Sequence, residues 1–241
     1  MFDIRPDERA RVFLMALYLF LVLSVHYILK PISRGMFLEK FDIDRLPHLY
    51  LLVAVIGGLL ATLYTRAALR ASLRAAIGWS TAVSALSFVA FWWAFQVEPR
   101  LQPKWLLYVF NLWANLFGVV VVAQCFLVAG NVFTSREAKR VYGVIGLGAN
   151  IGAVASSLFT SVLVKKVGAR PLVLVCALLV VLGYAAFRLM LAQKGVSLLK
   201  ARVAEAEEAQ AHVRDMFRTI GRHRHLQVIM GIISLVFVVD V

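Results

Sequence analysis

The chain has 241 residues, 61% of them hydrophobic and 16% charged, and its mean hydropathy is +0.82. Soluble domains are about half apolar and about a quarter charged, so this composition excludes a water-soluble globular protein and predicts an integral membrane protein. The net charge of +13 comes from basic residues between apolar runs, where they set topology and face lipid headgroups; we therefore expect the bilayer, and no nucleic acid, as a partner.

Six apolar runs follow one another, each near the ~20 residues that cross a bilayer. The first reaches Leu29 and lacks a signal-peptide cleavage site, so we expect it to be retained. Pro31 removes a backbone donor, so we expect this helix to kink or end there, with a polar connection at 32–46. The other runs are predicted at 47–66, 76–95, 105–133, 141–164 and 171–191, and residues 134–140 are expected as a short basic turn between the fourth and fifth.

The sequence changes character after the sixth run, so we divide the chain into three parts. Residues 1–193 form the six-span part. Residues 194–224 are rich in charge and helix formers with a thin apolar stripe, which predicts a cytoplasmic amphipathic linker helix. Residues 225–241 are apolar but too few to span a bilayer. We interpret them as a truncated seventh span and expect the chain to be a fragment of a longer protein.

Lysines and arginines are distributed unevenly between the two sides of the predicted bundle. Sixteen fall on the side of the N-terminus and nine on the other, which favours a cytoplasmic N-terminus. Six spans, a long charged inner connection and a further span match the plan of a major-facilitator transporter, in which two six-helix halves enclose a substrate path. The predicted fold is therefore an all-α membrane protein, the N-terminal half of such a transporter.

Polar residues at membrane depth are the candidates for a substrate site. In the first span, His26, Lys30 and Arg34 are four residues apart and share a face, with Tyr27 beside them. They predict a cationic, aromatic corner suited to an anion. The alternative is that Lys30 and Arg34 only extend to the interface.

The fourth span carries two pairs of amides. Asn111 and Asn115 share one face, and Gln124 and Asn131 share the roughly opposite face with Trp113. One pair is expected to face the central cavity and the other to hydrogen-bond between helices, and the sequence leaves open which.

The remaining motifs predict packing rather than chemistry. Gly148 and Gly152 form a GxxxG pattern inside an apolar run, without the strand that a nucleotide-binding loop requires, so they predict close helix packing, as does the pair Gly57 and Gly58. The two cysteines, Cys125 and Cys176, lack ligand spacing and are expected in the core; the sequence shows no catalytic constellation, and we expect no enzyme, metal or cofactor.

Three stretches resemble the ATP/ADP translocase family of nucleotide exchangers of bacteria and plastids. They are Tyr27-Ile-Leu-Lys30, Leu46-Pro47, and the run from Ala114-Asn-Leu-Phe-Gly through Glu137-Ala-Lys-Arg140 to Gly146-Leu-Gly-Ala-Asn150. The resemblance implies a twelve-span antiporter of the bacterial inner membrane, of which this chain holds the first half and lacks the C-terminal half. Lys30, Arg34 and His26 would bind substrate phosphates, and Tyr27 or Trp113 would stack on a base. Ser33 and Asn115 stand where the family has charged residues.

Two alternatives stay open. The chain could belong to a major-facilitator transporter for an unrelated substrate, which shares the fold and differs only in the cavity. It could also be a non-transporting accessory module, in which the polar residues within the membrane only hold helices together.

Overall fold

The computed structural model describes residues 9–70, 73–97, 103–133 and 135–193. The predicted linker helix at 194–224 and seventh span at 225–241 lie outside the described residues. The described part contains six helices long and apolar enough to cross a membrane. They are α1 (Arg9–Leu38), α2 (Leu46–Arg70), α3 (Leu73–Val97), α4 (Lys104–Val132), α5 (Ser135–Val167) and α6 (Arg170–Ala192), with a short 3₁₀ segment η1 (Ile43–Arg45) before α2.

The first helix is longer than the sequence predicts. It continues through Pro31 to Leu38 instead of ending near Leu29, so the connection to α2 is much shorter than 32–46. A membrane helix tolerates proline where neighbouring helices and local adjustments compensate for the lost hydrogen bond. The added turns are held by Phe37, which is fully buried and stacks on Phe41 with ring centroids 4.5 Å apart.

The predicted basic turn is mostly helical as well. Helix α5 begins at Ser135, so most of residues 134–140 form its first turns rather than a loop. Glu137 lies in the first turn, where the positive end of the helix dipole favours a carboxylate. Its Oε1 lies 3.5 Å from Nη2 of Arg11, and this ion pair joins the first turns of α1 and α5.

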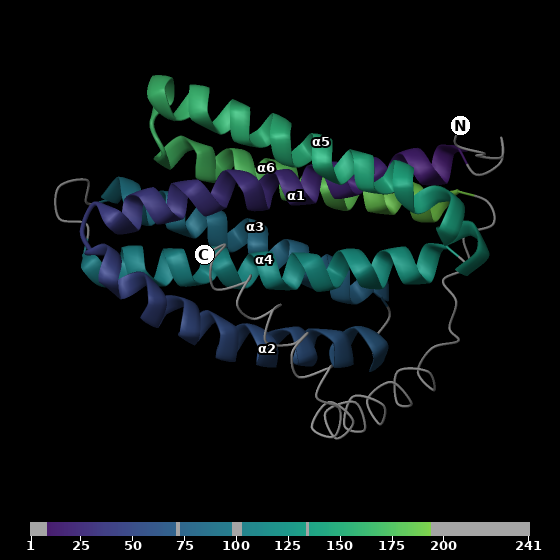
Figure 1. The fold of residues 1–241 in the computed structure, drawn as a ribbon, viewed down its shortest axis with the longest axis horizontal. Coiled ribbons are helices and arrows are strands. Elements are labelled where there is room, and N and C mark those ends of the chain that lie inside the picture. Colours follow the sequence, from purple (N-terminus) through teal and green to yellow (C-terminus); the bar gives the residue numbers. More distant parts are fainter. Residues whose placement is uncertain (1–8, 71–72, 98–102, 134, 194–241) are drawn as a thin grey trace, which may run out of the picture. The chain divides into compact units, whose positions relative to one another are not determined.

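The six helices pack as two related sets of three (Figure 1). Helix α1 packs against α5 and α6, and α4 packs against α2 and α3, while α1 meets α4 and α3 meets α6. If α1 is exchanged with α4, α2 with α5 and α3 with α6, the list of helix pairs in contact stays the same. The helix neighbours are thus related by this exchange, with α1 and α4 at the centre, although α1 packs far more extensively on α6 than α4 does on α3.

Glycines set the closest approach between α1 and α5. A Cβ atom on Gly148 would lie 2.8 Å from the carbonyl oxygen of Ala16, and one on Gly152 would lie 2.8 Å from that of Phe20. These neighbours are backbone atoms, so the predicted GxxxG packing is confirmed. The prediction is half right for the other pair, since Gly57 approaches Val119 of α4 and Gly58 faces open space.

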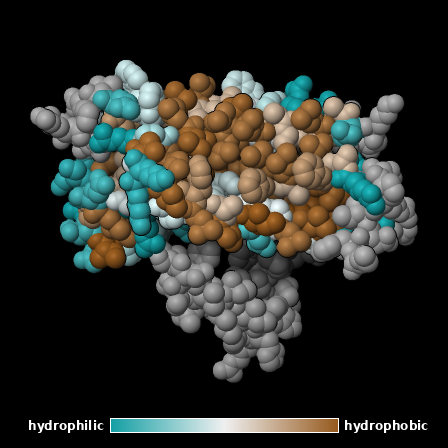
Figure 2. Space-filling view, turned by 90° about the horizontal axis from the view of Figure 1, so that it is seen from above, coloured by the Kyte–Doolittle hydropathy of each residue, from teal (hydrophilic) through white to brown (hydrophobic). Residues whose placement is uncertain are grey.

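Apolar side chains cover the middle of the helical unit, and hydrophilic ones gather at both ends of the helices (Figure 2). Helix α5 shows the pattern well, because Leu147, Ile151, Val154 and Leu158 are all exposed along it. Such a large exposed apolar surface is stable only against lipid or other apolar helices. The described unit is thus built as a multi-pass membrane protein.

Candidate functional site

The centre of the bundle is the contact between α1 and α4, and one hydrogen bond fixes their relative height. Asn111, which is buried, donates from Nδ2 to the carbonyl oxygen of Ser33 at 3.0 Å. With about 1.5 Å per residue, Asn111 lies about 10 Å along α4 from Lys104. The two helices run in opposite directions, so Lys30 lies nearly a turn deeper, about 15 Å from that end.

With a bilayer centred on α4, this height would put the backbone of Lys30 below the membrane surface. Helix α4 has 29 residues and is about 44 Å long, while the hydrocarbon core is about 30 Å thick. Lys30 then lies several ångströms inside the hydrocarbon boundary. A lysine at this depth is costly unless it faces a polar cavity or a counter-charge.

Tyr27, Lys30 and Arg34 lie on the part of α1 that its neighbours leave uncovered. Lys30 is exposed, Tyr27 is 40% exposed and Arg34 is half-buried. Helix α1 contains no acidic residue over its 30 positions. The helix thus presents two cations and a phenol one turn apart, as the sequence predicts for residues four apart.

His26 occupies the middle of the same interface. It packs against Gly118 of α4, where any Cβ atom would overlap the imidazole ring, so only glycine fits. Its Nδ1 is buried and has no hydrogen-bond partner among the described residues. Tyr27 meets the ring edge-on, with centroids 5.5 Å apart.

Asn111 and Asn115 serve the helix contact directly. Asn115 donates from Nδ2 to the side-chain and main-chain oxygens of Asn111, both at 2.8 Å. Asn111, Asn115 and Gly118 are spaced i, i+4 and i+7, which is one face of a helix. That spacing identifies Gly118 as part of the site, and sequence analysis missed it by treating the amides alone.

The second amide pair corrects the expected division of roles. Gln124 accepts a hydrogen bond from Oγ of Ser80 in α3 at 3.2 Å, while Asn131 donates to Leu127 of its own helix. Each pair therefore supplies one interhelical hydrogen bond, whereas the sequence suggested that only one pair would. Helix α4 is therefore hydrogen-bonded to α1 on one face and to α3 on another.

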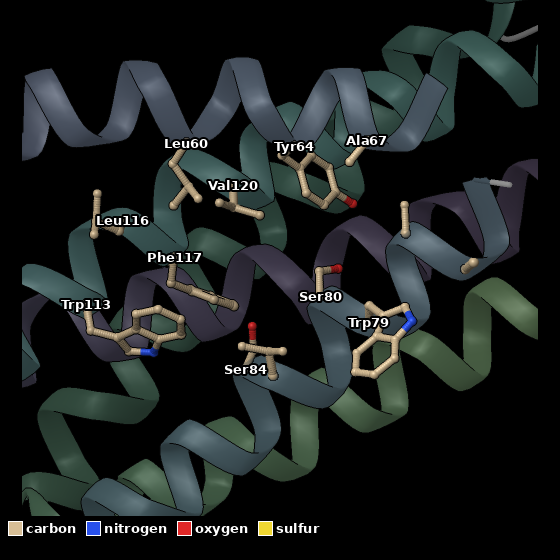
Figure 3. A pocket seen from close by; sticks show the side chains of 13 residues that line it. Leu60, Tyr64, Ala67, Trp79, Ser80, Ser84, Trp113, Leu116, Phe117 and Val120 are labelled. Atoms are coloured by element: carbon tan, nitrogen blue, oxygen red, sulfur yellow. The ribbon is translucent and has the colours of Figure 1, made fainter. Parts of the chain in front are cut away.

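Trp113 lies apart from the other candidate residues. It lines a cavity of about 460 Å³ between α2, α3 and α4, together with Tyr64, Trp79 and Phe117 (Figure 3). Its indole Nε1 is buried without a hydrogen-bond partner in the described part of the chain. The structure thus places His26 and Asn111 at the α1–α4 contact, with Asn115 one turn along α4 from Asn111, and leaves Tyr27, Lys30 and Arg34 on the uncovered part of α1. Trp113 lies on a different side of α4.

No described group of three His, Cys, Asp or Glu residues is arranged to hold a metal ion. Cys125 and Cys176 are both buried and free, as expected of packing residues. The polar groups at the α1–α4 contact are amides, an imidazole, a phenol and two cations. This set is suited to binding an anionic or hydroxyl-rich molecule.

A sequence model of the family described as "MFS/sugar transport protein" matches residues 73–239, more than half of the chain. The chain belongs to this major-facilitator family. This relation between the helix neighbours agrees with the family's plan, in which each six-helix half contains two related three-helix units. No curated protein and no solved structure matches the chain. The predicted all-α transporter fold is confirmed, and membership makes the chain part of a membrane transporter for a small molecule.

Proposed function

We propose that this protein is a secondary transporter for a phosphorylated or other organic anion, working by alternating access like the nucleotide antiporters that its sequence resembles. The supporting observation is the depth of Lys30, on an acid-free face of α1 and about 15 Å from the end of the bundle. An anionic substrate supplies the counter-charge that such a cation requires in a low-dielectric site.

The proposed roles follow from position. Lys30 and Arg34 bind the substrate's phosphate or carboxylate groups, and Tyr27 contacts its organic part. His26 offers the unpartnered Nδ1 at mid-membrane depth, where substrates of this transporter class bind. Asn111 acts by holding α1 against α4, and Asn115 by hydrogen-bonding to Asn111 within α4. We place Trp113 outside this set because it lines the cavity between α2, α3 and α4.

The whole-protein arrangement is part of the same proposal. A second six-helix half would close the cavity over α1 and α4, and the two halves would rock around the site. The N-terminus would be cytoplasmic, because the basic residues concentrate on that side, and the membrane would be the bacterial inner membrane.

A second candidate is transport of a sugar. The family description names sugar transport, and amide and aromatic side chains such as Asn115 and Tyr27 suit a hydroxyl-rich substrate. In that case Lys30 would donate hydrogen bonds to hydroxyl groups instead of neutralising charge. A neutral sugar would then bind where an anion does not.

Ligand-dependent thermal unfolding of the purified full-length protein separates these candidates. ATP, ADP, a sugar phosphate and the matching free sugar are added in turn, because a ligand that binds the folded state raises the unfolding temperature. We expect the phosphorylated compounds to raise it. The Lys30→Ala variant should need at least tenfold more ligand for the same rise in unfolding temperature, since a hydrogen bond to a charged group contributes about 1.5–3 kcal/mol.

Lys104→Ala is the matched control, because Lys104 is an exposed lysine at the end of α4 and should leave the effect unchanged. Stabilisation by the free sugar alone would replace the anion proposal with the sugar candidate. Equal responses of the Lys30→Ala variant and the unaltered protein to the phosphorylated compounds would contradict the role of Lys30.

A further inference from the structure

The cavity between α2, α3 and α4 plays no part in the proposed transport site. Its volume is about 460 Å³, and most of its lining is apolar, including Leu60, Val83 and Val120 (Figure 3). Ala67 on α2 and Trp79 and Val83 on α3 also line it, and all three are exposed. The cavity therefore reaches the surface between α2 and α3, and the exposed side chains there are apolar.

Arginines lie in the chain beside the residues that line one end of this cavity. Ala67 and Ala75 line the cavity, and Arg66 and Arg74 directly precede them in the chain. Both arginines are exposed, and Arg70 is the last residue of α2. The sequence from Leu46 to Val97 contains no acidic residue. This end of the cavity thus carries uncompensated positive charge within α2 and α3.

Between the basic end and the apolar interior lies a hydrogen-bond donor. Tyr64 lines the cavity, and its buried hydroxyl lies beside Ser80 of α3, which lines the cavity as well. It precedes Arg66 by two residues and Arg70 by six, about 3 Å and 9 Å along the helix. From the end of the cavity near Ala67 and Ala75, the order is therefore cations, then a phenol, then apolar walls. A glycerophospholipid has a phosphate, then ester carbonyls, then acyl chains in the same order.

We propose that this cavity binds one acyl chain of an anionic glycerophospholipid from the surrounding bilayer, with its phosphate against Arg66 and Arg74. The acyl chain gains little from leaving other lipid chains, which are equally apolar. Preference for one lipid therefore comes from charge, and each arginine near an anionic membrane surface should contribute about fivefold. The hydroxyl of Tyr64 donates a hydrogen bond to an ester carbonyl of the lipid.

Quenching of tryptophan fluorescence by brominated lipids tests the proposal without any transport measurement. The full-length protein keeps Trp113 and has every other tryptophan replaced by phenylalanine. It is reconstituted with equal fractions of phosphatidylglycerol and phosphatidylcholine, and the acyl chains of one lipid at a time are brominated. We expect brominated phosphatidylglycerol to quench Trp113 several-fold more strongly than brominated phosphatidylcholine.

Three variants identify the source of this preference. In the double variant Arg66→Gln/Arg74→Gln, the two brominated lipids should quench the fluorescence of Trp113 equally. Ala67→Phe narrows the cavity and keeps both arginines, so it should also abolish the preference at Trp113. Arg9→Gln removes an exposed arginine from the same end of the bundle and should change nothing.

Two results would overturn the proposal. One is equal quenching by the two lipids in the otherwise unaltered protein. The other is a preference that survives both the arginine and the Ala67→Phe substitutions, because it would then come from the general charge of the bundle end. Neither result bears on the anion site at Lys30, which lies on α1.

Discussion

At the scale of single residues, His26 of α1 packs directly on Gly118 of α4, where there is no room for a Cβ atom. A methyl group at position 118 would overlap the imidazole ring, so we expect Gly118→Ala to destabilise the protein by about 1–3 kcal/mol. The measurement is the unfolding temperature in detergent.

A double variant shows whether this contact is the cause. In the presence of His26→Ala, the ring is gone and Gly118→Ala should cost much less, because the two substitutions act on one contact. Additive losses in the double variant would mean that Gly118 is required for another reason.

The hydrogen bond from Asn111 to Ser33 permits a second comparison at this scale. Asn111→Ala removes the buried hydrogen bond between α4 and α1. Hydrogen bonds between membrane helices contribute about 0.6 kcal/mol on average and up to about 1.7 kcal/mol. Asn131→Ala is the matched control, because Asn131 bonds only to its own helix. We expect a lower unfolding temperature for the first variant and little change for the second. A larger loss from Asn131→Ala would refute the assigned roles.

At the scale of helices, the sequence predicts correctly which helices exist and in which order they follow. It predicts poorly where each helix begins and ends. All six spans are present in the described residues, because apolar runs of about 20 residues have few other stable structures. The errors lie at Pro31 and at residues 134–140, where polarity suggested loops. There tertiary contacts decide instead: Phe37 stacking on Phe41 extends α1, and Glu137 paired with Arg11 caps α5.

The contact between α5 and α1 gives a prediction with an internal control. Gly148→Ala places a Cβ atom against the backbone of Ala16, which has no side-chain freedom to move away. We expect a loss of about 1–3 kcal/mol. Gly146→Ala, on the same helix, meets open space and should be neutral or slightly stabilising, since alanine favours helices over glycine.

Comparison of the two unfolding temperatures in detergent is the measurement. If both substitutions lowered stability equally, glycine would matter here for flexibility rather than for close packing.

At the scale of the whole molecule, spacing predicted which residues share a helix face but not which helices meet. The helical period grouped Tyr27, Lys30 and Arg34 and put Trp113 and Asn115 on roughly opposite faces of α4. Which neighbouring helices those two faces meet was decided by how α1, α2 and α3 pack on α4. The relative height of Lys30 likewise needed the bond between Asn111 and Ser33.

Topology is a further prediction at this scale. If the N-terminus is cytoplasmic, cysteines introduced at Lys40 and Lys165 should react with a membrane-impermeant maleimide added outside intact cells, and one at Arg66 should react only after the cells are opened. Cys125 and Cys176 are buried, so background labelling should be low. The reverse pattern would invert the proposed orientation.

Nucleotide exchange by the full-length protein in proteoliposomes tests the central claim most directly. The vesicles are loaded with unlabelled ADP or left empty, and uptake of radiolabelled ATP is followed for the unaltered protein, Lys30→Ala and Lys104→Ala. We predict uptake that internal ADP stimulates, that Lys30→Ala abolishes and that Lys104→Ala preserves. The opposite result would be that correctly inserted protein takes up a neutral sugar but neither ATP nor any other anion. That result would contradict the claim that the cations of α1 form an anion site.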